Sequence, residues 1–140
     1  MGCPVLEELY LTNFQWRKAT IFDVCSSSLN ILQYDTCQTV RNKFRIGTPN
    51  LRHLYLTTAE VVELRAPKLR CLKLRDFVFC EGFDMEEMPF IAETCLDPSS
   101  NCLSIVLKFL HAVSGLKALH LGIQVIRVGF LLINIPPPPN

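Results

Sequence analysis

The sequence has few charged residues and a net charge close to zero. Charged side chains make up 19% of the 140 residues, with 14 lysines and arginines against 13 aspartates and glutamates. A net charge of +1 gives no bulk attraction for nucleic acid or for an anionic membrane, so we expect neither as a partner. At 49% hydrophobic residues the chain is too apolar to stay disordered, and its length suits a single domain.

Signatures of enzymes and of exported proteins are missing as well. No C-x-x-C, G-x-S-x-G, G-x-G-x-x-G or phosphate-loop pattern occurs. The chain opens without a basic and then apolar leader, and no stretch approaches the ~20 apolar residues of a membrane-spanning helix. We therefore predict a non-enzymatic protein of the cytoplasm or nucleus, with no catalytic residue, no cofactor and no metal.

Seven cysteines stand at irregular spacings. An odd number favours free thiols in a reducing compartment over a framework of disulfides. Cys95, Cys102 and His111 lack a fourth ligand at a spacing usual for zinc, and nothing marks Cys25 or Cys71 as an activated nucleophile. Buried structural thiols are the simpler interpretation, and a small thiol or zinc enzyme is a remote alternative.

What the sequence does contain is an internal repeat. The pattern P-x-L-x-x-L-x-L begins at Pro4, Pro49 and Pro67, and looser copies begin near residues 27, 89 and 114. The first apolar positions of the six copies are 6, 29, 51, 69, 91 and 116, which gives spacings of 23, 22, 18, 22 and 25. All but the 18 fall within the range of ~20–29 residues that is typical of leucine-rich repeats.

Each copy of the pattern predicts one short strand that follows a turn. The last two leucines alternate along an extended segment and point to one side, and the first leucine reaches the same core from the turn. The proline lacks an N–H and stiffens that turn. Because one unit cannot bury three leucines, the units must stack, so that Leu54, Leu56, Leu72 and Leu74 become core residues.

The repeat therefore predicts an α/β fold of the leucine-rich repeat solenoid type, with a curved parallel sheet and an irregular convex side. One array should span residues 1–140 and end in an apolar, proline-rich tail over 128–140. Over 12–27 and 38–48 we expect loops or short strands on the convex side. Their candidate core residues are Ile21, Phe22, Val24, Val40, Phe44 and Ile46.

One connector has a different periodicity from the others. Its apolar residues follow the i, i+3, i+4, i+7 rhythm of a helix: Leu103, Val106, Leu107, Leu110 and Val113. We predict a helix near residues 101–114, with Gly115 as its end.

Four blocks are more distinctive than a lone L-x-x-L-x-L. They are residues 2–9 (G-C-P-V-L-E-E-L), 48–51 (T-P-N-L), 66–69 (A-P-K-L) and 103–121, the last with S-G-L-K-A-L at 114–119. Together they resemble the leucine-rich portion of plant F-box proteins, including those that carry an FBD segment. The resemblance implies a protein-protein interaction module that serves as the substrate-recruiting arm of an SCF-type ubiquitin ligase.

In that family an N-terminal F-box docks on a Skp adaptor. Here the repeats follow Met1 directly and no F-box stretch precedes them, so we do not expect this chain to bind the adaptor. Two other interpretations stay open: the array belongs to a different intracellular sensor or scaffold, or it is a truncated copy without function.

The positions that flank the strand leucines should form one solvent-facing surface. They are Glu8, Tyr10 and Thr12; Ile31, Gln33 and Asp35; His53, Tyr55 and Thr57; Cys71, Lys73 and Arg75; Glu93, Cys95 and Asp97; Ala118 and His120. Such a mixture of aromatic, charged and hydrogen-bonding groups is typical of protein-recognition surfaces. We predict that a partner protein contacts Tyr10, Gln33, His53, Tyr55, Lys73, Arg75 and His120.

Charge is segregated along the chain. Residues 41–75 hold nine lysines and arginines against Glu60 and Glu63, a net +7, whereas residues 76–97 hold seven acids and no base, a net −7. We expect the two blocks to compensate each other across neighbouring repeats. The alternative is an acidic partner that is guided to the basic half.

Overall fold

The computed structural model describes residues 5–12, 21–36, 42–98, 109–111, 113 and 115–122. Among these residues there are eight strands: β1 (Glu8–Thr12), β2 (Ile21–Cys25), β3 (Ile31–Asp35), β4 (Asn42–Gly47), β5 (His53–Arg65), β6 (Cys71–Met85), β7 (Glu93–Pro98) and β8 (Ala118–Leu121). In this part of the chain, no helix is long and apolar enough to cross a membrane.

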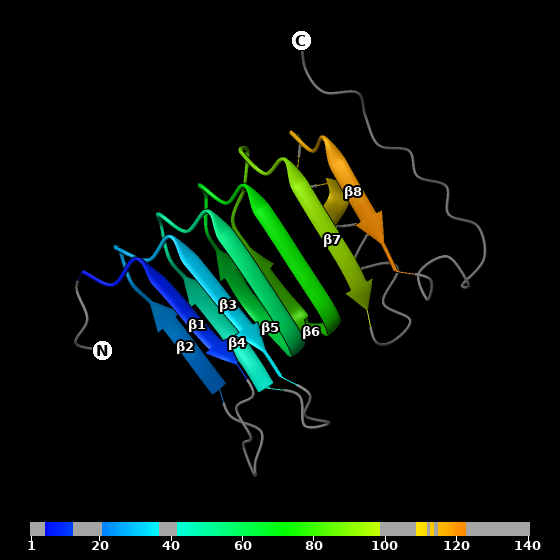
Figure 1. The fold of residues 1–140 in the computed structure, drawn as a ribbon. Helices are drawn as coiled ribbons and strands as arrows, with labels where there is room; N and C mark the ends of the chain where they lie inside the picture. The colour runs from blue at the N-terminus through cyan, green and yellow to red at the C-terminus, as the bar shows by residue number, and fades with distance from the viewer. Residues whose placement is uncertain are drawn as a thin grey trace.

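The strands form two layers of a parallel solenoid (Figure 1). The front layer has the order β1-β3-β5-β6-β7-β8, and each neighbouring pair is parallel. Behind it, β2 pairs with β4, and β4 pairs with the second half of β5, which in turn pairs with the second half of β6. The predicted parallel-strand solenoid is confirmed. The α/β label holds only in part, because strands make up nearly all of the described secondary structure and only residues 109–111 are helical.

Three front strands, β5, β6 and β7, begin from a turn whose second residue is the repeated proline. The N–H of the first apolar residue of each of these repeats donates to the carbonyl three residues earlier: Leu51 to Thr48 at 3.2 Å, Leu69 to Ala66 at 3.0 Å and Ile91 to Met88 at 3.4 Å. Proline suits the second position of such a turn because its fixed φ matches the required backbone and its missing N–H is not needed there. The turn also explains why the first leucine enters the core, since Leu51 and Leu69 are both fully buried.

Successive turns of the solenoid are linked by a recurring pair of hydrogen bonds at the start of each front strand. The carbonyl of Asn30 accepts from the N–H groups of Arg52 at 2.8 Å and His53 at 3.1 Å, and the carbonyl of Arg52 accepts from Arg70 and Cys71 in the same way. This pattern locks the register of neighbouring strands. It places every strand leucine of one unit beside its equivalent in the next, for example Leu54 beside Leu72.

The exceptional spacing of 18 residues corresponds to a unit without a loop between its layers. The single strand β5 turns from the front layer to the back layer at Thr58, which has φ 51°, and β6 does so at Asp76, with φ 48°. The Thr58 hydroxyl donates to the Asp76 carboxylate at 3.3 Å, so the two corners support each other. The following unit is longer because residues are inserted in β6, where Val61 and Glu63 pair with Phe79 and Asp84.

The core lies between the two layers. The repeat leucines Leu54, Leu56, Leu72 and Leu74 are at most 2% exposed, which confirms their predicted position. At one end of the core an aromatic cluster joins the layers, with the Tyr34 ring 5.7 Å from Phe22 and 5.0 Å from Phe44. The side-chain amide of Asn42 donates to the Tyr34 hydroxyl at 2.6 Å, which satisfies a buried polar group.

The expectations for the convex side are met in part. Phe44 and Ile46 are buried, and Phe22 and Val24 are partly buried against the core, as predicted. Ile21 was expected in the core but is 60% exposed, because it starts β2 and the alternation of that strand turns it outward. Val40 lies outside the described residues.

Most of the predicted helix at 101–114 also lies outside the described residues. Residues 109–111 are helical, and Phe109, Leu110 and Val113 are buried. A Cβ atom at Gly115 would lie 2.9 Å from the carbonyl oxygen of Pro89, so the backbones approach too closely there for any other residue. The tail over 128–140 is outside the described part of the chain.

Candidate protein-binding surface

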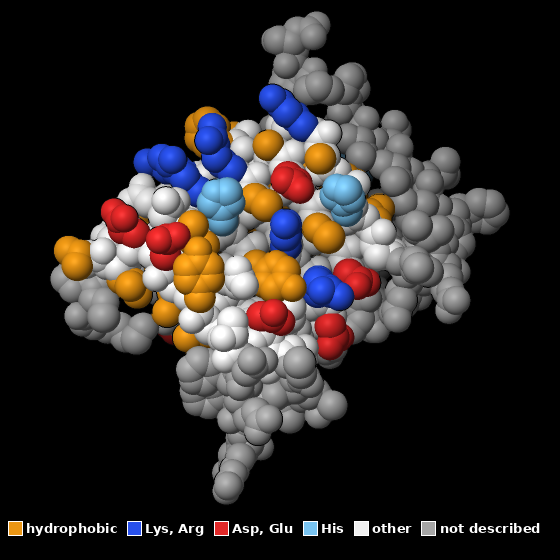
Figure 2. Space-filling model, viewed as in Figure 1, with side chains coloured by type: hydrophobic (Ala, Val, Ile, Leu, Met, Phe, Trp, Pro, Cys, Tyr) orange, Lys and Arg blue, Asp and Glu red, His pale blue; other side chains and the backbone are white. Residues whose placement is uncertain are grey.

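The solvent-facing side of the front layer, here called the front face, carries its side chains in aligned rows. The central row runs Tyr10, Gln33, Tyr55, Lys73, Cys95 and His120, each paired with the next across parallel strands. The row before it runs Glu8, Ile31, His53, Cys71, Glu93 and Ala118. This is the alignment that the repeat predicted. Figure 2 shows that the face mixes apolar, basic, acidic and histidine side chains.

The third row departs from the prediction at one position. It runs Thr12, Asp35, Thr57, Arg75 and Asp97, but Thr57 is 7% exposed and not available to a partner. The Thr57 hydroxyl accepts from the N–H of Thr36 at 2.8 Å, so it is bound into the neighbouring turn. The cause is the corner at Thr58, which draws the end of the front strand inward.

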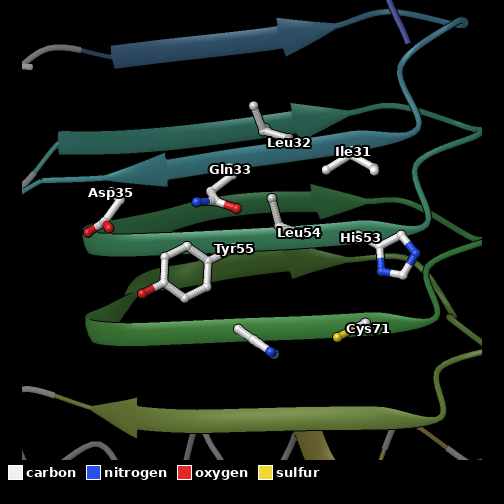
Figure 3. A pocket seen from close by; sticks show the side chains of 9 residues that line it. Ile31, Leu32, Gln33, Asp35, His53, Leu54, Tyr55 and Cys71 are labelled. Atoms are coloured by element: carbon white, nitrogen blue, oxygen red, sulfur yellow. The ribbon is translucent and has the colours of Figure 1, made fainter. Parts of the chain in front are cut away.

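A hollow of about 330 Å³ lies in the middle of the front face, over β3, β5 and β6 (Figure 3). Four of the seven predicted contact residues line it: Gln33, His53, Tyr55 and Lys73. Its other lining residues are Ile31, Leu32, Asp35, Leu54 and Cys71. Apolar and polar groups thus converge on a space that fits one or two side chains of a partner.

The remaining three predicted residues do not line this hollow. Arg75 is next to the hollow, because its guanidinium forms a hydrogen bond with the Tyr55 phenol, which lines the hollow. This hydrogen bond, together with the carboxylates of Asp97 and Asp35, raises the pKa of the Arg75 guanidinium. Tyr10 and His120 stand on β1 and β8, near opposite ends of the central row and away from the hollow. The seven residues therefore share one face but do not form one compact site.

Tyr10 is the most exposed aromatic side chain of the central row, at 51%. Its hydroxyl donates to the Glu8 carboxylate at 3.1 Å, and this hydrogen bond to Glu8 raises the pKa of the phenol. A large, exposed aromatic ring held in one orientation is well suited to act as an anchor for a partner.

The thiol that lines the hollow is not activated. Burial, and then the nearby Glu93 carboxylate, raise the pKa of the Cys71 thiol, so the thiol stays protonated and is a poor nucleophile at neutral pH. Cys25, Cys71 and Cys95 are free. No group of three or more potential metal ligands occurs among the described residues.

On the back layer, one ion pair joins the basic and acidic blocks that we expected to compensate each other, and two further pairs lie within the basic block. Arg65 donates to Glu63 at 2.5 Å and to Asp84, and Arg45 lies 3.5 Å from Glu63. Asp84 belongs to the acidic block and Arg65 to the basic block, so the predicted pairing across neighbouring repeats is confirmed there. The pairs are exposed and stabilise the fold only modestly.

Comparison with known proteins adds one similarity. The chain is 28% identical over 138 residues to an F-box/LRR-repeat protein of Arabidopsis thaliana, an alignment that includes 91% of this chain and 26% of the relative. The chain thus spans about a quarter of the length of the curated relative it matches. No family model and no solved structure matches. Similarity and fold together indicate a repeat protein of the interaction type.

Sequence reasoning missed part of the site. Ile31, Asp35 and Cys71 line the hollow but were not among the seven predicted contacts, although they stood in the predicted rows. Arg52 and Arg70, just before β5 and β6, are exposed at the edge of the same face and were outside those rows. The repeat itself could have indicated Arg52 and Arg70, since both occupy the position directly after the first leucine of their unit.

Proposed function

We propose that this chain is a non-enzymatic module that binds another protein through its front face. The observation that carries the proposal is the alignment of the central row in register over six strands, with the hollow at its middle. The row offers aromatic, amide and cationic groups side by side, which is the composition of a recognition surface. The partner that we propose is a protein of the cytoplasm or nucleus.

The weak similarity to an F-box/LRR-repeat protein supports a narrower form of the proposal. In this form the front face recruits the substrate of an SCF-type ubiquitin ligase. The repeats then supply only the affinity for the substrate, and transfer of ubiquitin is carried out by other parts of the ligase.

The proposal is tested by retention of proteins from an Arabidopsis thaliana extract on the immobilised chain. Proteins that bind the front face should be retained by the natural chain and lost on the double variant Tyr55→Ala/Lys73→Ala. The control is Lys43→Ala, which removes an exposed cation from the back layer and should retain the same proteins. Equal retention by all three chains would contradict the proposal.

If the front face recruits a ubiquitin-ligase substrate, the retained protein should also be degraded in a way that depends on this chain. A ligase substrate should accumulate in cells in which the gene for this chain is disrupted. Unchanged abundance of a protein that depends on Tyr55 and Lys73 for retention would leave the binding function standing and refute the ligase role.

A further inference from the structure

The basic block of residues 41–75 is divided between two faces, and only one part of it is neutralised. On the back layer, Arg45 and Arg65 meet the carboxylates of Glu63 and Asp84. On the front, Arg52, Arg70 and Lys73 are exposed, and none of the three belongs to an ion pair among the described residues. The fold thus leaves a group of cations uncompensated on the face that carries the hollow.

Two of these cations stand directly side by side. The N–H of Arg70 donates to the carbonyl oxygen of Arg52 at 2.9 Å, so the two residues are cross-strand neighbours at the N-terminal edge of the front layer. Adjacent strands are about 4.8 Å apart, and like charges at that separation disfavour strand pairing. An arrangement that costs stability and has no internal counter-charge is explained most simply by an external anion.

Carboxylates lie at both edges of the front face. At the N-terminal edge, Glu7 and Glu8 belong to the β1 unit, and β3 separates them from Arg52. Asp35 and Asp97 lie near the C-terminal ends of β3 and β7, where both act on Arg75. Glu93, at the start of β7, is the one carboxylate in the row that contains His53 and Cys71 over β3 to β7. Ligand carboxylates are therefore attracted to the part of this edge where Arg52 and Arg70 precede β5 and β6.

We propose that the front face binds a peptide segment rich in aspartate and glutamate, whose carboxylates pair with Arg52 and Arg70 while an adjacent side chain enters the hollow beside Tyr55 and Lys73. This inference rests on the proposed protein-binding function and names its partner class. The arginine fork matches a carboxylate with two parallel hydrogen bonds, so two neighbouring arginines suit two acidic side chains. The hollow supplies the contact that is not electrostatic.

The test is a selection of short random peptides, displayed on phage, against the full chain at physiological ionic strength. Recovered peptides should be enriched in aspartate and glutamate relative to the starting library. Synthetic copies of the most enriched sequence should bind Arg52→Glu and Arg70→Glu at least about fivefold more weakly, which corresponds to one exposed ion pair each. The control Lys43→Glu makes the same reversal on the back layer and should change the affinity by less than about twofold.

Failure of this inference is distinguishable from failure of the proposed function. Recovered peptides that lack acidic residues, and that depend on Tyr55 but not on Arg52 or Arg70, would overturn the acidic-peptide assignment and leave the binding face in place. Failure to recover any peptide that depends on front-face residues would overturn both. Circular dichroism of each variant verifies that the charge reversals leave the fold unchanged.

Discussion

Replacement of Leu72 by alanine tests the register on which the whole front face depends. Leu72 is fully buried in β6, between Leu54 and Thr94 of the neighbouring strands, and all three point into the core. The substitution removes three carbon atoms, at about 0.8 kcal/mol for each buried methylene, and leaves a cavity. The expected loss in the free energy of unfolding is therefore about 2 to 5 kcal/mol, a large share of the stability of a small domain.

The matched control is the next residue along the strand. Lys73 is exposed, so Lys73→Ala should change the free energy of unfolding by no more than about 0.5 kcal/mol. Urea denaturation followed by circular dichroism measures both, and the Leu72→Ala midpoint should fall by on the order of 1 to 2 M. Equal destabilisation by the two variants would refute the register, because a slip of one residue exchanges the buried and exposed faces of a strand.

Two further predictions concern other parts of the molecule. Tyr34→Phe removes the hydroxyl that accepts from Asn42 but keeps the ring contacts, so it should cost about 0.5 to 1.5 kcal/mol in thermal or urea unfolding. Tyr10→Phe, at an exposed position, should leave the free energy of unfolding nearly unchanged. Equal losses in the two variants would contradict the stabilising role of the buried hydrogen bond between Tyr34 and Asn42. Because the pKa of Cys71 is raised, its alkylation by iodoacetamide at pH 8 should be slower than that of the exposed Cys25, and its rate should increase as the pH rises. Peptide mapping by mass spectrometry measures the two alkylation rates. Equal rates in the folded protein would refute the prediction.

The front layer could be predicted from the sequence because the repeat contains its own register. The proline fixes the turn, and the leucines that follow it fix which side of each strand is buried, so the rows of Tyr55 and Lys73 follow directly. That a partner protein binds these rows is still a prediction, because the alignment of the residues does not test it.

The back layer and the corners could not be predicted with the same detail. β2 and β4 share no repeated motif, and their short alternation does not reveal which face is inward, so Ile21 was misplaced. Thr58 adopts a positive φ, which is unfavourable for a β-branched residue and has no signature in the sequence. The burial of Thr57 follows from that corner and was missed for the same reason.

The central claim is that partners dock on the front face, and site-specific photocrosslinking tests it most directly. Tyr10 and Ile21 are matched positions, since they are 51% and 60% exposed but lie on the front and back layers respectively. A photoreactive phenylalanine analogue is placed at one position or the other, and the chain is irradiated with a retained partner. The account predicts a covalent adduct from position 10 and none from position 21. An adduct from position 21 alone would contradict it.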